Sequence, residues 1–453
     1  MADSVTAPRP LFRREALTRL IVPLVIEQFL LMSVGMMDTV MVTTAGQAAV
    51  SGVSLVDNIN QLIIQIFSAL STGGAVICSQ YLGRQDVEDA RTAAKQLLYT
   101  VFGLALVLMA GALCFRQHIL SLLFGNIESD VMDSALVYFL ATAMAYPFIS
   151  LYNAGAALFR SMGNSKVSMF NSLIVNLVNV AVNAALIYGC HMGALGAGIG
   201  TLVSRIVAAV FILYLLQHHD NLLKIEGLFQ VRIRRDMVGR ILTIGIPNGL
   251  ENGLFQAGKL VVLSLITTFG TNAVAANAIA NSVAGVVCVP GQAVGLAMIT
   301  VVGQCMGARQ PEQAVSYAWR LVGIVYAAMG TMSVLMFLFS EQVCSIFQLT
   351  PEAAAMAALC LRWCMVFYLL IWPLAFTLPN ALRAAGDAVF TMAVSLMSMF
   401  LFRIAFSYVL SCSWGFSMGL LGVWIAMIID WGVRSLVFVI RFCRGGWKKI
   451  QLI

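Results

Sequence analysis

Acidic and amide side chains interrupt the most apolar stretches of this chain at positions where a cation or a proton could bind. Asp38 and Asp57 lie in consecutive apolar segments, each about one and a half helical turns from the end where the segments meet. Asn179 and Asn183 are four residues apart in a later segment, so they share one face if that segment is helical. Carboxylate and amide oxygens suit Na⁺, and a desolvated carboxylate can carry a proton. These four residues predict a cation-coupling site, with Na⁺ at Asp38, Asn179 and Asn183 or H⁺ on a carboxylate. The alternative is a polar cluster that only pins three helices together.

Two glutamates follow prolines with the same spacing in the two halves of the chain. Pro23 precedes Glu27 by four residues, and Pro247 precedes Glu251 by four residues. Because proline frees a backbone carbonyl and permits a kink, we expect both helices to bend there. Each glutamate is either tied to a neighbouring helix or serves a substrate or a proton, and the sequence leaves both roles open.

Other charged and aromatic side chains in apolar segments have simpler interpretations. Asp430 and Arg434 are spaced for an ion pair on one helix, and Lys259 is a candidate to neutralise a carboxylate on another helix. Tyr368 and Trp372 could line a cavity for flat or cationic organic molecules, although aromatic residues in membrane helices usually serve packing.

The proline and glutamate pairs belong to a repeat with a constant offset of 224 residues. The matching motifs include Gly46-x-x-Ala49 with Gly270-x-x-Ala273, and Gln80-x-x-Gly83 with Gln304-x-x-Gly307. Later the offset drifts slightly, with Leu158-Phe159-Arg160 matching Ala381-Leu382-Arg383. The chain is therefore built from two copies of one unit.

The two aspartates of the first half have no acidic counterpart in the second half. Val262 corresponds to Asp38, and Asn281 corresponds to Asp57. A structural element of the repeat would be expected in both copies, whereas a single coupling site needs only one. This difference favours cation coupling for the aspartates.

The composition places the whole chain in a membrane. Apolar residues make up 60% of the chain, charged residues make up 10%, and the mean hydropathy is +0.90. Backbone groups in hydrocarbon must be satisfied within the segment, so apolar runs of about 20 residues are expected to be helices. The expected spans are 17–43, 51–78, 93–115, 132–155, 166–188, 194–216, 240–268, 274–302, 315–339, 354–380, 388–411 and 418–440.

These spans predict an all-α polytopic membrane protein with twelve transmembrane helices in two six-helix lobes. An even number of helices per repeat relates the lobes by a pseudo-twofold axis along the membrane normal. The expected domains are an N-lobe over 1–216, a cytoplasmic linker over 217–239 and a C-lobe over 240–453. A substrate is expected in the cleft between the lobes.

Basic residues collect in alternate loops, which predicts the orientation of the chain. Arg116 stands alone on the opposite side, so we expect both termini in the cytoplasm of a bacterial cell, with the chain in its plasma membrane. The net charge of +7 is then a topology signal rather than a sign of nucleic-acid binding. We expect a monomer that contacts membrane lipid and a small-molecule substrate and has no cofactor beyond the coupling ion. The clustered basic residues are Arg9, Arg13, Arg14, Arg19, Arg84, Arg91, Lys95, Arg160, Lys166, Lys224, Arg232, Arg234, Arg235, Arg240, Arg309, Arg320, Arg383, Arg441, Arg444, Lys448 and Lys449.

Several motifs together resemble the multidrug and toxic compound extrusion (MATE) family over almost the whole chain. They are Met37-Asp38-Thr39, Ser79-Gln80-Tyr81-Leu82-Gly83, Leu158-Phe159-Arg160-Ser161-Met162-Gly163, Gly196-Ala197-Gly198, Gly303-Gln304 and Ala381-Leu382-Arg383. The resemblance implies a V-shaped antiporter that exports organic, often cationic, drugs or metabolites in exchange for Na⁺ or H⁺. It also implies that Asp38 is a cation-coupling residue and that Asn179 and Asn183 belong to its pocket.

The chain departs from that family in its second half. Members with a well-described second-lobe site carry a glutamate where this chain has Phe255 and Gln256, and a further acid that the region around Trp372 lacks. We therefore expect coupling in the N-lobe, with Gln256 a substrate or hinge residue of the C-lobe. The main alternative is a flippase for a lipid-linked saccharide or other amphipathic cargo. An enzyme is not expected, because the sequence has no phosphate-binding glycine loop, histidine-rich metal set or nucleophile motif.

Overall fold

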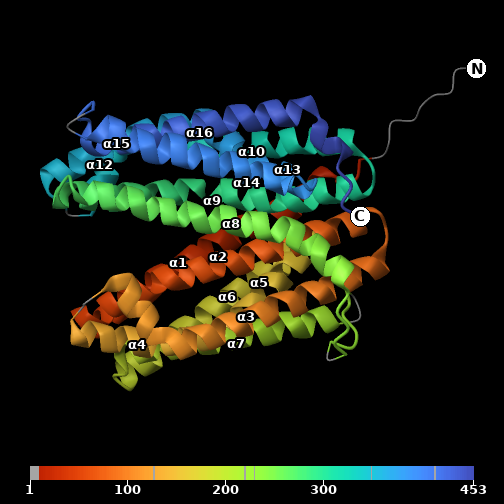
Figure 1. The fold of residues 1–453 in the computed structure, drawn as a ribbon, viewed down its shortest axis with the longest axis horizontal. Coiled ribbons are helices and arrows are strands. Elements are labelled where there is room, and N and C mark those ends of the chain that lie inside the picture. The colour runs from red at the N-terminus through yellow and green to blue at the C-terminus, as the bar shows by residue number, and fades with distance from the viewer. Residues whose placement is uncertain (1–9, 126–127, 219–220, 229, 348, 413–414) are drawn as a thin grey trace, which may run out of the picture.

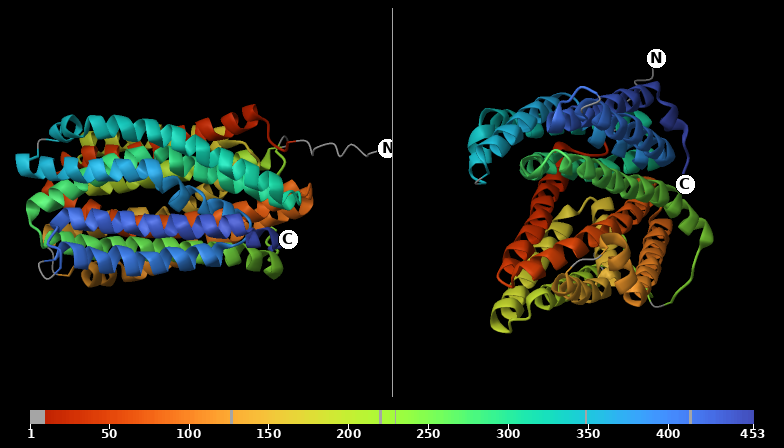
Figure 2. Two further views of the ribbon diagram at one scale, coloured as in Figure 1. Left: turned by 90° about the horizontal axis from the view of Figure 1, so that it is seen from above. Right: turned by 60° about the vertical axis from the view of Figure 1, so that its left-hand side comes forward.

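The computed structural model describes residues 10–453, apart from 126–127, 219–220, 229, 348 and 413–414. Its helices form two bundles that lie side by side, one made by the first half of the chain and one by the second (Figures 1 and 2). The first bundle consists of α1 (Arg14–Thr43), α2 (Gln47–Gly83), α3 (Val87–Phe124), α4 (Ser129–Met144), α5 (Tyr146–Ser161), α6 (Ser165–Asn183), η1 (Ala184–Gly189) and α7 (Gly193–Gln217). We refer to α1–α7 as the N-lobe.

The second bundle, the C-lobe, has the same plan with more breaks in its helices. It consists of α8 (Arg235–Thr267), α9 (Thr271–Gly307), α10 (Pro311–Leu338), α11 (Ser340–Ser345), α12 (Pro351–Leu370), η2 (Pro373–Thr377), α13 (Pro379–Ala384), α14 (Ala388–Ser398), η3 (Met399–Ile404), α15 (Ala405–Ser411), α16 (Gly419–Arg444) and η4 (Gly446–Lys449). The exact domain boundaries expected from the sequence stay a prediction.

Each of the twelve expected spans coincides with helical structure, but they differ in how clearly they qualify as membrane spans. Among the described residues, ten helices are long and apolar enough to cross a membrane, or eleven if the bent pair α4 and α5 is one span. That pair bends by 46°, with Pro147 in the first turn of α5. The remaining segment is α8, which is long enough but carries Glu251, Gln256 and Lys259 within its apolar stretch.

The backbone repeats along with the sequence. Gly46 and Gly270 precede α2 and α9 with φ angles of +100° and +94°, a region that an L side chain rarely adopts. The non-glycine residues Gln85 and Arg309 follow the same two helices with φ angles of +65° and +57°. Because these positions are 224 residues apart, equivalent turns occur at equivalent places in both lobes.

The lobes are joined at the end of the molecule that carries Leu11, Gly83, Gly307 and Leu452, which we call the terminal face. Leu17, Leu20 and Leu24 of α1 belong to the apolar core of the C-lobe. The N-terminal segment also reaches the C-lobe, where the Leu11 amide donates to Gln313 and the Phe12 amide donates to Tyr317. The C-terminus lies at the same end (Figure 1).

At the terminal face the ends of α2 and α9 approach each other closely. A Cβ atom on Gly83 would overlap the backbone carbonyl of Gln304, and a Cβ atom on Gly307 would overlap the carbonyl of Gln80. These four residues form two pairs that the repeat relates to each other. Glycine is therefore required on both sides of the crossing to let the backbones approach.

The connection between the lobes runs from the end of α7 at Gln217 to the start of α8 at Arg235. Its described part lies along α3 of the N-lobe. The Gln96 amide donates to the carbonyl of Arg232 over 2.7 Å, and the Tyr99 hydroxyl donates to the carbonyl of Leu228 over 2.7 Å.

Candidate functional site

Asp38 lies in the middle of a small polar cluster of the N-lobe. The Asn183 amide donates to Asp38 Oδ1 over 2.6 Å and to Asn179 Oδ1 over 3.2 Å. Both asparagines are fully buried and Asp38 is half-buried. The structure thus brings together α1 and α6 at the three residues for which the sequence predicts Na⁺ coordination. Asn183 Oδ1 is buried and has no hydrogen-bond partner, which leaves an acceptor oxygen beside the carboxylate.

Asp57 belongs to an adjoining network that enters from α2 and α4. The Tyr138 hydroxyl donates to Asp57 Oδ1 over 2.9 Å, and the Asn60 amide lies 3.5 Å from the same oxygen. The Tyr146 hydroxyl in turn donates to Asn60 Oδ1 over 3.0 Å. Asp57 is close enough to Asp38 to interact electrostatically but is held by different partners. The sequence analysis did not connect Tyr138 or Tyr146 with the aspartates.

The only basic side chain near these aspartates among the described residues is Arg205 of α7. Its guanidinium lies 5.8 Å from the centre of the Tyr152 ring, and no ion pair within 4 Å joins it to Asp38 or Asp57 in the part of the chain that the structure describes. Because like charges repel and only one cation is nearby, the site has an excess of negative charge. A bound cation or proton would reduce that excess.

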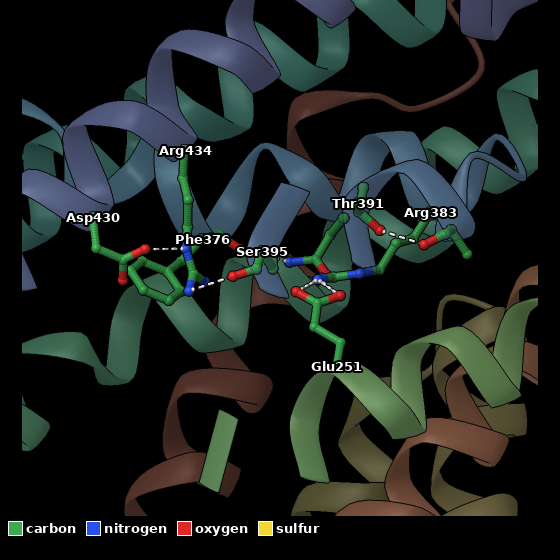
Figure 3. A network of polar contacts seen from close by, with 9 residues as sticks. Glu251, Phe376, Arg383, Thr391, Ser395, Asp430 and Arg434 are labelled. Carbon is green, nitrogen blue, oxygen red and sulfur yellow. Dashed lines mark hydrogen bonds and ion pairs between the residues drawn. The ribbon is translucent and has the colours of Figure 1, made fainter. Parts of the chain in front are cut away.

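Glu27 and Glu251 differ from the aspartates because each forms an ion pair. Arg160 Nη1 lies 3.0 Å from Glu27 Oε1, and the Ser168 hydroxyl donates to Glu27 Oε2 over 2.6 Å. Arg383 Nη2 contacts both oxygens of Glu251 over 2.7 and 2.8 Å (Figure 3). All four charged groups are largely buried.

The two arginines were expected in cytoplasmic loops, as part of the topology signal, and that expectation is wrong. Arg160 lies in the last turn of α5, and Arg383 lies in α13, where each turns toward the glutamate of its own lobe. A signal was present in the sequence, since both the glutamates and the arginines recur in the repeat. Pro23 and Pro247 lie inside α1 and α8, and the bends expected there stay predictions.

Asp430 and Arg434 form the ion pair that their spacing predicts, with Arg434 Nε 2.8 Å from Asp430 Oδ1. A third member joins from η3, because Arg403 Nε lies 3.2 Å from Asp430 Oδ2. Arg434 also donates to the carbonyl of Ser395 over 3.0 Å (Figure 3). One carboxylate therefore serves two buried arginines.

Lys259 does not neutralise a carboxylate, contrary to the role for which the sequence made it a candidate. Among the described residues no acid lies within ion-pair distance of its ammonium group. Lys259 and Arg403 both lie over the ring of Phe255, at 5.1 and 4.7 Å from the ring centre. The C-lobe interior is therefore electropositive.

Tyr368 and Trp372 are packed in the apolar core of the C-lobe, exposed by only 5% and 6%. The Cys288 thiol donates to the Tyr368 hydroxyl over 3.1 Å, and the Trp372 ring stacks on Phe376 at 5.0 Å. Gln256 is half-buried on α8. A role for these three residues in substrate binding or at a hinge is not tested and stays a prediction.

Three π-helical segments adjoin the polar residues described above. η1 begins directly after Asn183, η2 begins directly after Trp372, and η3 contains Arg403. A π-turn rotates the following residues relative to a regular helix and is frequent at functional sites. Sequence periodicity does not reveal such turns.

Two joined helical bundles with buried charges at membrane depth define a polytopic membrane transporter. The MatE family model matches residues 23–185 and again residues 247–409, so the second match begins and ends 224 residues after the first. The chain belongs to the MatE family of transporters, which are not enzymes.

Known proteins resemble the chain over nearly its full length. The probable multidrug resistance protein NorM of Thermotoga maritima is 26% identical over 446 residues, covering 96% of this chain and 93% of that protein. A crystal structure of MATE in the bent conformation superposes with a TM-score of 0.89 at 22% identity, covering 96% of each chain. The outward-facing conformation of a multidrug resistance MATE family transporter gives the same score at 21% identity, covering 96% of this chain and 97% of the other. These structures establish the fold.

Proposed function

We propose that the protein is a secondary active antiporter that exports organic molecules in exchange for Na⁺ or H⁺ by alternating access. Membership of the MatE family and the similarity to a probable multidrug resistance protein support a multidrug cargo. The basic residues at the terminal face support a cytoplasmic location for both termini, in the plasma membrane. With that orientation, the joined terminal face is the closed cytoplasmic side of the transporter.

The observation that carries the coupling proposal is the environment of Asp38. It is an intramembrane carboxylate with amide partners and no basic residue within ion-pair distance among the described residues. A charged residue costs about 2.5 to 3.5 kcal/mol at the centre of a membrane helix on insertion scales, and an uncompensated carboxylate within a span calls for a functional reason. Cation binding there changes the balance between two conformations if the affinity differs between them.

Transport in proteoliposomes tests the proposal. A fluorescent organic cation is offered under a Na⁺ gradient at fixed pH and, separately, under a pH gradient without Na⁺. We expect one of the gradients to drive transport by the unaltered protein and Asp38→Asn to reduce that transport at least tenfold. Asp133→Asn is the matched control, since Asp133 is an exposed acid of the same lobe. Undiminished gradient-driven transport by Asp38→Asn excludes Asp38 as the coupling residue.

A further inference from the structure

The two lobes carry opposite charge at membrane depth. In the N-lobe, Asp38 and Asp57 have no ion-pair partner among the described residues. In the C-lobe, Asp430 is the counter-charge of both Arg403 and Arg434, while Lys259 has none in the described part of the chain. Because Glu251 is occupied by Arg383, this part of the C-lobe has an excess of positive charge.

Lys259 lies on the wall of the C-lobe that is turned toward the N-lobe. On α8, Gly245 and Gly249 contact α2, while Gly258 packs against Met399 in the C-lobe. Successive residues of a helix are rotated by about 100° around its axis. Lys259 therefore projects between the side of α8 that faces α2 and the side that faces Met399. Its side chain is solvent-accessible, in contrast to the buried arginines behind it.

Three cationic side chains lie close to one aromatic ring. Phe255 is half-buried, with the Lys259 ammonium 5.1 Å, the Arg403 guanidinium 4.7 Å and the Arg434 guanidinium 5.1 Å from its ring centre. A ring quadrupole attracts cations but does not cancel their charge. The exposed Lys259 ammonium in front of the buried arginines therefore favours a negative group from outside the described chain.

We propose that Lys259, backed by Phe255 and Arg403, forms an anion-binding subsite for the carboxylate of an aromatic, amphipathic cargo. The ammonium group donates charge-assisted hydrogen bonds to the carboxylate, and Phe255 provides an apolar surface for the aromatic body of the cargo. Together with the acidic N-lobe, this subsite favours zwitterions that carry one charge toward each lobe. The inference rests on the proposed transport function and names the class of its cargo.

A matched pair of dyes tests the subsite without requiring transport. Rhodamine B carries a carboxylate on a cationic aromatic body, and its ethyl ester has the same body with the carboxylate blocked. Binding of both dyes to the full chain in phosphatidylcholine nanodiscs is measured by fluorescence anisotropy. We expect the acid to bind about tenfold more tightly than the ester, which is the effect of one charge-assisted hydrogen bond.

The variants locate that preference at Lys259. Lys259→Gln is expected to bring the two affinities together without weakening the ester, and Lys259→Arg is expected to keep the preference. Lys166→Gln removes an exposed lysine of the N-lobe and is expected to leave it unchanged. Equal binding of acid and ester by the unaltered protein overturns the subsite. A preference that survives in Lys259→Gln, or an equal loss of both dyes in that variant, also overturns it.

The two proposals fail independently. If Asp38→Asn abolishes gradient-driven transport while Lys259→Gln keeps the dye preference, the subsite is wrong and the coupling proposal holds. If the preference depends on Lys259 while neither gradient drives transport, the subsite holds and the coupling proposal is wrong.

Discussion

Glu27 and Glu251 occupy equivalent positions in the two repeats, and each binds an arginine that is repeated as well. The sequence left open whether these glutamates serve transport or structure. The geometry favours structure, since a carboxylate bound by a buried guanidinium has little remaining capacity for another cation. Asp38 and Asp57, which have no ion-pair partner in the described part of the chain, in contrast occur in one lobe only.

Removing one member of the Glu251–Arg383 pair should destabilise the protein strongly. We expect Glu251→Gln to lower the free energy of unfolding by about 3 kcal/mol, because the Arg383 guanidinium then stays buried without a counter-charge. Thermal unfolding in detergent measures the effect.

A second substitution and a surface pair provide the controls for this prediction. Adding Arg383→Gln to Glu251→Gln should recover much of the lost stability, since no isolated charge is left. Glu341→Gln breaks the exposed pair with Arg362 and should cost less than about 1 kcal/mol. A double variant that is less stable than Glu251→Gln alone would contradict this explanation.

At the scale of elements, the crossing of α2 and α9 depends on the absence of side chains at two equivalent positions. We expect Gly83→Ala and Gly307→Ala to destabilise this conformation by about 1 to 3 kcal/mol each. Each new Cβ would overlap a backbone carbonyl, which cannot move aside as a flexible side chain could. Thermal unfolding of the two variants should give similar values, because the repeat relates the two contacts.

Gly111→Ala is the matched control for the crossing, since a Cβ there meets nothing within 4 Å. Alanine favours a helix over glycine by up to about 1 kcal/mol, so this control should be neutral or slightly stabilising. If Gly83→Ala proves as stable as Gly111→Ala, the close approach of the two helices is not a feature of the protein in the membrane.

Much of the helical framework could be predicted from the sequence, because lipid forces long apolar segments into helices. The Asp38 cluster was also predictable, since similar depth and i, i+4 spacing restrict which side chains meet. Ion pairs such as Glu27 with Arg160 were harder to predict, because they join helices far apart in the chain. Arg160 also falls just outside an expected span, where basic residues are usually in loops. Arg403 meets Asp430 through a π-helical turn that no apolar period reveals.

The whole molecule is held in one conformation by contacts that the repeat duplicates across the lobe boundary. Gln80 of α2 donates to the carbonyl of Ala384 in the C-lobe over 2.8 Å, and Gln304 of α9 donates to the carbonyl of Ser161 in the N-lobe over 2.8 Å. Each acceptor carbonyl directly follows the arginine that binds its lobe's glutamate. The closed terminal face is thus linked at two symmetric points to the buried ion pairs.

Alternating access requires these two hydrogen bonds to break when the terminal face opens. Each contributes about 1 kcal/mol net, so Gln80→Ala with Gln304→Ala should raise the population of the state open at that face about 30-fold relative to the closed state. Double electron–electron resonance between spin labels at Lys166→Cys and Ser316→Cys, on a background without the ten native cysteines, measures the distance between the lobes at this end. Both label sites are exposed, and they lie on different lobes.

A longer distance between the labels should appear in the double variant and, to a smaller extent, in each single variant. It should not appear in Gln117→Ala, the control, which removes an exposed glutamine of α3. An unchanged distance distribution in the double variant would show that the glutamines do not hold the face closed, and the backbone crossing at the two glycines would then be sufficient by itself.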